Sequence, residues 1–332
     1  MYYSPVNKYL WDFWVITSKK YYHLFHLQAP RKLPSPNDRH EFASIGHAVS
    51  SDLYHWTEKG TVLEKGPKGS WDDTSLWTGS AVKKDDLFYM FYTSRASREN
   101  RKIQRIGVAT SKDLNHWEKY KGNPIIEADS RWYETSRISE DGQEHWRDPF
   151  VIYHPREKIY YAFICARVNF GETGSRGCIG RAISRDLLHW EVISPGTKSG
   201  NFMQMEVPDV HIYNNQCYLV FSTTNLWYSE KHCREISPNE PQTGAHYYVC
   251  NDLSGIFTPI PQHEVLMGTD TYTYGTRIFR NFLNQMICLS WKEKLKELSD
   301  FAGYLDYPKR VTYSPDGTIT IISRTNSFSF TE

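Results

Sequence analysis

The sequence lacks an uninterrupted run of 18 apolar residues, and its 39 lysines and arginines almost balance its 38 aspartates and glutamates. The first absence predicts that no helix spans a membrane. The second leaves no general field to attract nucleic acid or an anionic membrane surface. The first residues, MYYSPVNKYLWDFW, lack the basic start, apolar stretch and small-residue cleavage site of a secretory signal. We therefore expect a cytoplasmic protein, with export by another route left open.

Metal-binding and disulfide patterns are also missing. None of the six cysteines forms a Cys-x-x-Cys pair, and free cysteines in apolar segments behave as small hydrophobic side chains. Reduced thiols are expected rather than a disulfide framework. The segment EKHCRE (230–235) has one His-Cys pair but no second ligand pair at zinc spacing. We expect no metal and no organic cofactor.

Long amphipathic helices are scarce, whereas aromatic residues make up 15% of the chain, a composition that suits a β-rich protein. One short motif recurs after a strand-like segment. Its copies are SDLYHW (51–56), SKDLNHW (111–117), SRDLLHW (184–190) and the degenerate NDLSGIF (251–257). We expect its aspartate to cap a turn and its tryptophan to pack between repeated units.

A second element precedes the motif: an apolar strand, a polar turn and a strand rich in Tyr, Phe and Leu. It occurs five times, beginning at Phe13, Thr78, Pro149, Asp209 and Gly275. Units of about 65 residues with four strands each are typical of propeller blades. The sequence therefore predicts an all-β fold, a five-bladed β-propeller that occupies residues 1–332 as a single domain. The expected blades are about 10–57, 72–118, 146–191, 206–257 and 272–330, with the segment GTITIIS (317–323) closing the ring and no β-sandwich after the fifth blade.

The residues at the start of each blade are the candidates for a functional site. The first strand of each blade in a propeller lines the central channel, so these residues are expected to meet in one funnel. They are Trp11 and Asp12, Trp77, Arg147 and Asp148, Glu206 and Asp209, and Tyr272 and Tyr274, with Tyr272 and His47 as further candidates for contact with a substrate.

Three carboxylates, Asp12, Asp148 and Glu206, would then share an aromatic pocket. Such a group is costly, because the charges repel one another and lose their hydration. The cost makes sense where one carboxylate attacks or stabilises a sugar carbon while another carboxyl group protonates the leaving oxygen. Aromatic faces stack on the apolar faces of sugar rings. The pattern therefore predicts a glycosidase.

Four segments resemble motifs of glycoside hydrolase families 32 and 68, the five-bladed β-fructosidases, invertases and levansucrases. LWDFWVI (10–16) is similar to the W-D-x-W nucleophile segment of the levansucrase type, and LWTGSAV (76–82) is similar to its W-S-G-S-A segment. WRDPFV (146–151) contains the R-D-P motif of both families, and MEVPDV (205–210) resembles the invertase-type E-C-P-D segment. The invertase-type N-D-P-N-G is absent, and Val207 replaces the usual cysteine. Each motif alone is weak, but their order and their blades make the resemblance specific.

The resemblance implies roles for individual residues. Asp12 would be the nucleophile and Glu206 the general acid/base, while Asp148 would bind fructosyl hydroxyls beside Arg147. Trp77 and Ser80 would shape the fructosyl subsite. The implied activity is retaining hydrolysis of β-fructofuranosides such as sucrose through a fructosyl-enzyme, with transfer to a sugar hydroxyl as an alternative to hydrolysis. The only partner implied is this small-molecule sugar.

Two other interpretations stay open at this point. An arabinofuranosidase or xylosidase resembling family 43 would use a similar carboxylate trio with inversion. A sugar-binding propeller without catalysis would hold the same ligand and turn nothing over. The long segments 128–146 and 225–246 are expected to rim the funnel and to select the leaving group or acceptor. Nothing in the sequence indicates the oligomeric state.

Overall fold

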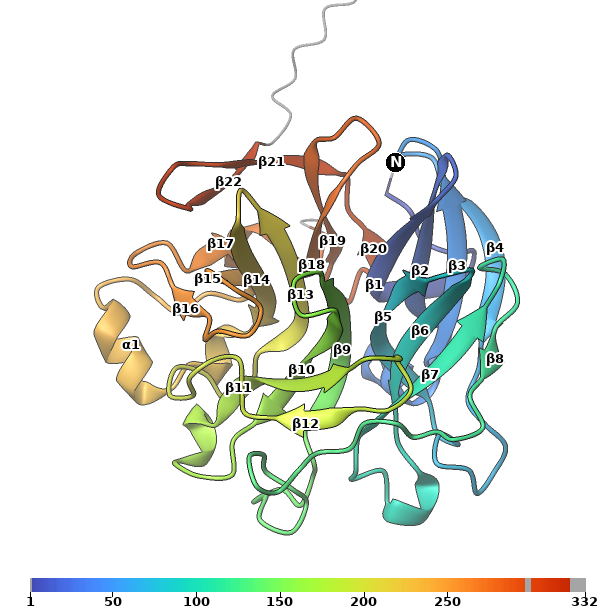
Figure 1. Ribbon diagram of the computed structural model, residues 1–332, viewed down its shortest axis with the longest axis horizontal. Coiled ribbons are helices and arrows are strands. Elements are labelled where there is room, and N and C mark those ends of the chain that lie inside the picture. The colour runs from blue at the N-terminus through green and yellow to red at the C-terminus, as the bar shows by residue number, and fades with distance from the viewer. Residues whose placement is uncertain (1, 296–299, 323–332) are drawn as a thin grey trace, which may run out of the picture.

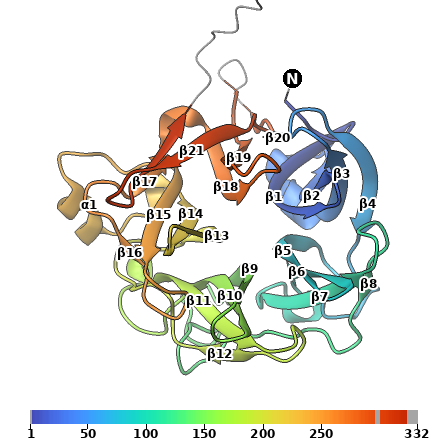
Figure 2. The same ribbon diagram turned by 45° about the horizontal axis from the view of Figure 1, so that its top comes forward.

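The structure is a computed structural model that describes residues 2–295 and 300–322. Its strands form five antiparallel sheets around a central axis (Figures 1 and 2). The first two sheets contain β1 (Lys8–Ser18), β2 (Tyr21–Pro30), β3 (Ser44–Ser50) and β4 (Thr57–Leu63), then β5 (Leu76–Lys84), β6 (Leu87–Ser94), β7 (Arg105–Ser111) and β8 (Glu118–Lys119). The third contains β9 (Trp146–His154), β10 (Ile159–Arg167), β11 (Gly177–Ser184) and β12 (Glu191–Ile193).

The fourth and fifth sheets complete the ring. The fourth contains β13 (Glu206–Tyr213), β14 (Gln216–Thr223), β15 (Gly244–Cys250), β16 (Thr258–Pro259) and β17 (Val265–Met267). The fifth contains β18 (Thr273–Arg280), β19 (Met286–Lys292), β20 (Tyr304–Leu305), β21 (Lys309–Tyr313) and β22 (Ile319–Ile322). Strands β1, β5, β9, β13 and β18 lie nearest the axis (Figure 2). The predicted five-bladed propeller is confirmed; residues 296–299 and 323–330 of the expected fifth blade lie outside the described residues.

The ring closes differently from the expectation. The described part of the segment 317–323 is β22, which pairs with β21 at the outer edge of the fifth blade. The contact between the first and fifth blades comes instead from the start of the chain. The backbone N–H of Leu305 donates to the carbonyl oxygen of Tyr3 at 2.8 Å, and the N–H of Leu10 donates to that of Gly303 at 3.0 Å. The prediction for 317–323 was wrong because this segment finds its partner within its own blade.

The repeated Asp-Leu-x-x-Trp motif has the predicted structural role. Asp52 accepts hydrogen bonds from the backbone N–H groups of Tyr54 and His55, both at 2.8 Å, and so caps the turn. The tryptophan packs on the preceding blade: Trp117 meets Phe25 edge to face at 5.4 Å between ring centroids. Trp190 meets Phe91 in the same way at 5.6 Å. The repeat thus supplies the packing between neighbouring blades.

Each innermost strand carries one extra residue relative to its partner strand, at the equivalent place in the blade. These β-bulges lie between Trp11 and Phe13, Trp77 and Gly79, Arg147 and Phe150, Glu206 and Asp209, and Tyr274 and Arg277. A bulge re-aims the side chains around it and is common beside active sites. Asp148 and Val207 have positive φ angles of 60° and 51° there, and for a β-branched residue such as Val207 this is a strained conformation.

The helices lie outside the blades. The helix α1 (Glu230–Ile236) follows the fourth-blade hairpin, and a 3₁₀ helix (Pro36–Glu41) lies between β2 and β3. No helix in the described ranges combines the length and apolar character that crossing a bilayer needs.

Candidate active site

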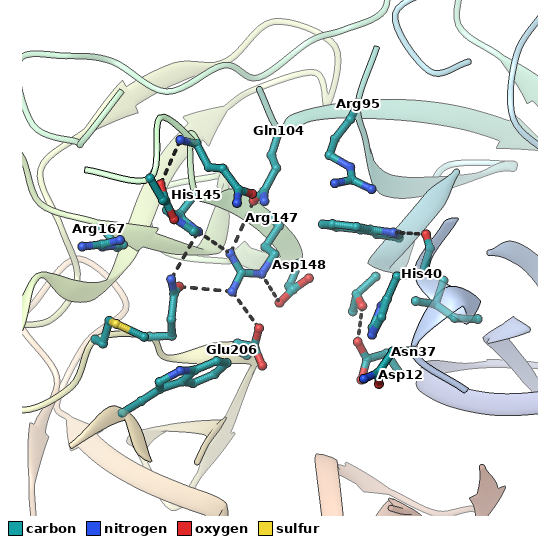
Figure 3. Close-up of a pocket in the computed structure, with 18 of the residues that line it drawn as sticks. Asp12, Asn37, His40, Arg95, Gln104, His145, Arg147, Asp148, Arg167 and Glu206 are labelled. Carbon is teal, nitrogen blue, oxygen red and sulfur yellow. Dashed lines mark hydrogen bonds and ion pairs between the residues drawn. The ribbon is translucent and has the colours of Figure 1, made fainter. Parts of the chain in front are cut away.

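One mouth of the central channel opens into a cavity of about 780 Å³ (Figure 3). Inner strands of the first four blades form its base. Its outer part, called the rim below, comes from the 3₁₀ helix Pro36–Glu41, Arg95, residues 140–145, Thr173 and Trp227. Six residues predicted from the sequence line this cavity: Trp11, Asp12, Trp77, Arg147, Asp148 and Glu206.

Asp12 lies at the bulge in β1 and receives two hydrogen bonds from other blades. The hydroxyl group of Thr78 donates to Oδ2, and Nε1 of Trp291 donates to Oδ1 at 2.9 Å. Burial raises the pKa of Asp12, and the negative charge of Glu206 raises it further. The two hydrogen bonds and the charge of Arg277 lower this pKa. The pKa of Asp12 is raised overall, and the two hydrogen bonds orient its carboxyl group.

Asp148 and Glu206 lie together around Arg147, on the opposite side of the cavity from Asp12 (Figure 3). Nη2 of Arg147 donates to Oε1 of Glu206 at 2.6 Å, and Nε lies 3.8 Å from Oδ2 of Asp148. The N–H of Val207 donates to Oδ2 of Asp148 at 3.1 Å. Burial raises the pKa of Asp148 to about 7; Arg147 opposes this rise, whereas the charges of Asp12 and Glu206 add to it.

Glu206 is held at both carboxylate oxygens. Arg147 contacts Oε1, and the hydroxyl group of Tyr274 donates to Oε2 at 2.7 Å. Burial and the charge of Glu206 raise the pKa of Tyr274, so its hydroxyl stays protonated and acts as the donor. The carboxyl group of Glu206 consequently has a fixed direction toward the cavity.

Arg147 is oriented by three polar neighbours. Its guanidinium donates to Oε1 of Gln204 at 3.1 Å, to Oε1 of Gln104 at 3.4 Å and to Nδ1 of His145 at 3.3 Å. Burial lowers the pKa of His145 to about 4, with the charge of Arg147 also contributing. The imidazole is therefore neutral near pH 7, and its Nδ1 can accept from Arg147.

Ser80 and Asp209 do not reach this cavity, which corrects the prediction that they bind substrate. Both line a second cavity of about 310 Å³ deeper in the channel. The hydroxyl oxygen of Ser80 accepts from the N–H of Val151 at 3.1 Å. Asp209 accepts from the N–H of Ile278 at 3.0 Å and lies 3.7 Å from Arg277. The bulges explain both errors. Each adds one residue to its strand, β5 or β13, so that Ser80 and Asp209 lie deeper in the channel, at the second cavity.

His47 and Tyr272 are also misplaced in the predicted site. His47 lies on β3, the third strand from the axis, where it stacks on Phe25 with ring centroids 4.6 Å apart. Tyr272 precedes β18 and is 39% exposed. Neither lines the cavity. Of the two tyrosines predicted at the start of the fifth blade, Tyr274 is the one that contacts Glu206.

Several residues of the site were missed. Thr78 follows the predicted Trp77 directly, so a known bulge position would have identified it. Trp291 lies on β19, the second strand of the fifth blade, whereas the sequence prediction considered only residues at the start of each blade. The rim residues come from segments outside the repeated strands. His40, for example, lies in the 3₁₀ helix Pro36–Glu41, where its carbonyl oxygen accepts from Nε1 of Trp77 at 2.9 Å. The expectation that segments 128–146 and 225–246 border the funnel is confirmed by the lining residues Glu140, Asp141, Gln143, His145 and Trp227.

One group among the described residues has metal-ligand geometry, away from the cavity. His154, Glu157 and Asp252 place ligand atoms within 4.8 Å of one another. Asp252 is already paired with Arg156 and, at 3.1 Å, with His154. The hydroxyl group of Tyr161 donates to Glu157 at 2.7 Å. These partners account for the cluster as an ion-pair network that joins the third and fourth blades.

Curated relatives of this chain act on fructosides, as their names state. It is 26% identical over 292 residues to a sucrose-6-phosphate hydrolase of Streptococcus mutans, which covers 85% of this chain and 53% of that protein. It is 27% identical over 199 residues to a levanbiose-producing levanase of Bacillus subtilis, which covers 58% of this chain and 33% of that protein. The chain spans about half the length, or less, of these curated relatives.

Solved structures share the fold. The inulosucrase of Halalkalicoccus jeotgali bound to kestose superposes with a TM-score of 0.80 at 24% identity, over 97% of this chain and 90% of that one. A levansucrase of B. megaterium superposes with a TM-score of 0.75 at 14% identity, over 96% and 85%. These likenesses concern the fold. The model of the glycosyl hydrolases family 32 N-terminal domain matches residues 12–321, which confirms the resemblance noted from the sequence: the chain belongs to glycoside hydrolase family 32.

Proposed function

We propose that the protein is a retaining β-fructofuranosidase that acts on sucrose or a related small fructoside, with some transfer to sugar hydroxyls. One observation carries the proposal. Asp12 is held by Thr78 and Trp291 on one side of the cavity, and Glu206 is held by Arg147 and Tyr274 on the other. Two oriented carboxyl groups that flank one cavity suit the two roles of a retaining glycosidase. Family membership and the names of the curated relatives support fructosides as substrates.

In the first step Asp12 attacks C2 of the fructosyl unit while Glu206 gives its proton to the departing oxygen. The bond from C2 to that oxygen breaks, and an ester between C2 and Asp12 forms. In the second step Glu206 takes a proton from water or from a sugar hydroxyl. The resulting oxygen attacks C2 and frees Asp12, so that two inversions give net retention.

The neighbouring residues support these steps. Asp148 lies beside Arg147 and accepts hydrogen bonds from fructosyl hydroxyls, which strengthen as charge develops at C2. Trp11 and Trp77 both line the cavity, and the partly exposed indole of Trp77 offers a face on which a furanose ring packs. Arg95 stacks over Trp77 at 3.9 Å and fixes the indole ring.

Sugar release tests this proposal. Wild type, Asp12→Asn and the control Asp86→Asn, an exposed residue in the β5–β6 turn, are incubated with sucrose, kestose and aryl arabinofuranosides. We expect fructose or fructosyl oligomers from wild type and from Asp86→Asn, and a loss of about 10⁴-fold or more in Asp12→Asn, since removal of a nucleophile has this order of effect. Arabinose without fructose would point to the inverting alternative. Sugar binding without any turnover would point to a non-catalytic propeller.

A further inference from the structure

The proposed function leaves the leaving group undefined, and the rim of the cavity carries information about it. We propose that the rim selects a neutral, hydroxyl-rich leaving group or acceptor and disfavours a phosphorylated one, with Glu140 and Asp141 as the residues that discriminate. This inference rests on the proposed function, because it names the substrate class of the same cavity.

The segment 140–145 borders the leaving-group side. It runs directly into Arg147, whose guanidinium contacts the carboxylate of Glu206. The residue that protonates the leaving oxygen lies next to that oxygen. The sugar attached to this oxygen therefore extends from Glu206 toward the rim formed by this segment.

The cavity has an excess of negative charge. Six acidic side chains line it: Asp12, Glu41, Glu140, Asp141, Asp148 and Glu206. Only three cationic side chains do so among the described residues, Arg95, Arg147 and Arg167. The excess stays negative even with a proton on each of Asp12 and Asp148. A sugar phosphate carries a charge of about −1.5 to −2 at pH 7, so it enters this cavity against repulsion.

The three arginines are already engaged. Arg147 contacts Glu206, and Nη2 of Arg95 contacts Oε1 of Glu41 at 3.1 Å. Arg167 donates from Nη2 to the carbonyl oxygen of Thr173 at 2.9 Å, and its Nη1 lies 3.4 Å from Glu134.

The remaining nitrogens of two of these arginines are out of reach. Nε of Arg95 and Nε of Arg167 have no partner, but both atoms are buried. Arg101 behind the rim pairs with Glu41 at 2.9 Å and does not line the cavity. A phosphate group would have to displace a carboxylate from its guanidinium in order to bind, and such a contact is strong.

The rim carboxylates suit hydroxyl groups. Asp141 is fixed by the hydroxyl of Ser139 at 2.6 Å and the N–H of Gln143 at 2.8 Å, both on Oδ1. The hydroxyl group of Thr173 donates to Oε1 of Glu140. Both acidic residues are exposed at the mouth. Ionised carboxylates only accept hydrogen bonds, and sugar hydroxyls donate them, whereas a phosphate dianion has no proton to donate.

Three substrates distinguish the effect of the leaving group's charge from that of its size: sucrose, sucrose 6-phosphate and raffinose. Raffinose carries a neutral galactosyl group on the oxygen that bears the phosphate in sucrose 6-phosphate. Turnover is measured for wild type, and binding is measured by calorimetry for Asp12→Asn. We expect kcat/KM and affinity for sucrose and raffinose to exceed those for sucrose 6-phosphate by at least about 10-fold, because like charges disfavour a complex. Added salt should narrow this gap.

Two variants test whether Glu140 is a residue that discriminates against the phosphorylated leaving group. Glu140→Gln should narrow the gap in kcat/KM between sucrose and sucrose 6-phosphate several-fold, because the phosphate meets one negative charge fewer, and the control Glu172→Gln, exposed but outside the cavity lining, should leave the gap unchanged. Equal or better use of sucrose 6-phosphate by wild type overturns the inference, as does equal rejection of raffinose, which would make the effect one of size. Neutral sugars that bind in preference to the phosphate without turnover support the charge selection and refute the proposed function.

Discussion

Nη2 of Arg147 donates a hydrogen bond of 2.6 Å to Oε1 of Glu206. The same guanidinium lies 3.8 Å from the carboxylate of Asp148, so one buried cation serves two carboxyl groups of different blades. Asp12, on the other side of the cavity, is instead held by the neutral donors Thr78 and Trp291. Asp12, Asp148 and Glu206 occupy equivalent positions of the repeat, but their different partners give the carboxyl groups different electrostatic surroundings.

The hydrogen bond from Thr78 stabilises the charged form of Asp12, and a nucleophile must be charged. Thr78→Val removes the donor and raises the pKa of Asp12. The acid limb of the pH profile of kcat/KM should therefore move to higher pH, while Thr78→Ser, which keeps the hydroxyl, should retain the wild-type limb. An unchanged acid limb in Thr78→Val would show that this hydroxyl does not control the nucleophile.

Tyr274 and Tyr272 form a matched pair, since only the first contacts Glu206. Tyr274→Phe loses the bond to Oε2, and a hydrogen bond to a charged group is worth about 1.5–3 kcal/mol. We expect kcat to fall by about 10- to 100-fold in Tyr274→Phe and to stay near wild type in Tyr272→Phe. Similar losses in both variants would contradict the placement of Tyr274.

The raised pKa of Asp148, about 7, links stability to pH. The folded protein keeps a proton that the unfolded chain releases near the ordinary value of 3.8. Between these values the unfolded chain binds fewer protons, so this carboxyl group lowers stability as pH rises through 7. Asp148→Asn should therefore gain in Tm over wild type, by several degrees, between about pH 4 and about pH 8.

Asp141 serves as a control, because its pKa is shifted in the opposite direction to that of Asp148. Although burial raises its pKa, the hydrogen bonds from Ser139 and Gln143 outweigh that effect, and the pKa is lowered overall. Its contribution to stability is present at neutral pH and lost as pH falls through the folded-state pKa. Asp141→Asn should accordingly be less stable than wild type at high pH and approach it in acid. Parallel curves for all three proteins would refute the linkage.

Arg277 joins the blades below Asp12, Asp148 and Glu206. Its side chain donates to the carbonyl oxygens of Phe13 at 2.9 Å, Gly79 at 3.3 Å and Pro208, and lies 3.7 Å from Asp209. Arg277→Ala leaves Asp209 buried without its counter-charge, which costs about 3–5 kcal/mol.

Denaturant unfolding measures this effect of Arg277. The midpoint should fall markedly in Arg277→Ala, and Asp209→Asn in the same background should recover part of the loss. No recovery would mean that the lost carbonyl contacts, rather than the unpaired charge, account for the effect.

Much of this architecture follows from the sequence, because a propeller repeats its packing. The Asp-Leu-x-x-Trp motif marks the contact between blades, and equivalent blade starts brought Asp12, Asp148 and Glu206 to one cavity. The errors have a physical cause: period-two alternation does not reveal a bulge. The bulges shift Ser80 and Asp209 to the second cavity, deeper in the channel, and of the two tyrosines predicted at the fifth blade only Tyr274 contacts Glu206. Rim residues such as His40, in the 3₁₀ helix Pro36–Glu41, and Arg95, directly after β6, lie outside the repeated strands, so the repeat does not constrain them.

The mass of the enzyme during turnover shows directly whether Asp12 forms a covalent bond to the fructosyl unit. Glu206→Ala is mixed with β-fructofuranosyl fluoride, whose leaving group needs no proton, and the intact protein and its peptides are weighed. If Asp12 is the nucleophile of a retaining enzyme, the second step lacks its base. A mass increase of one fructosyl unit should then accumulate on the peptide that contains Asp12. Fluoride release with no added mass, or with the fructosyl unit on another residue, would contradict this account.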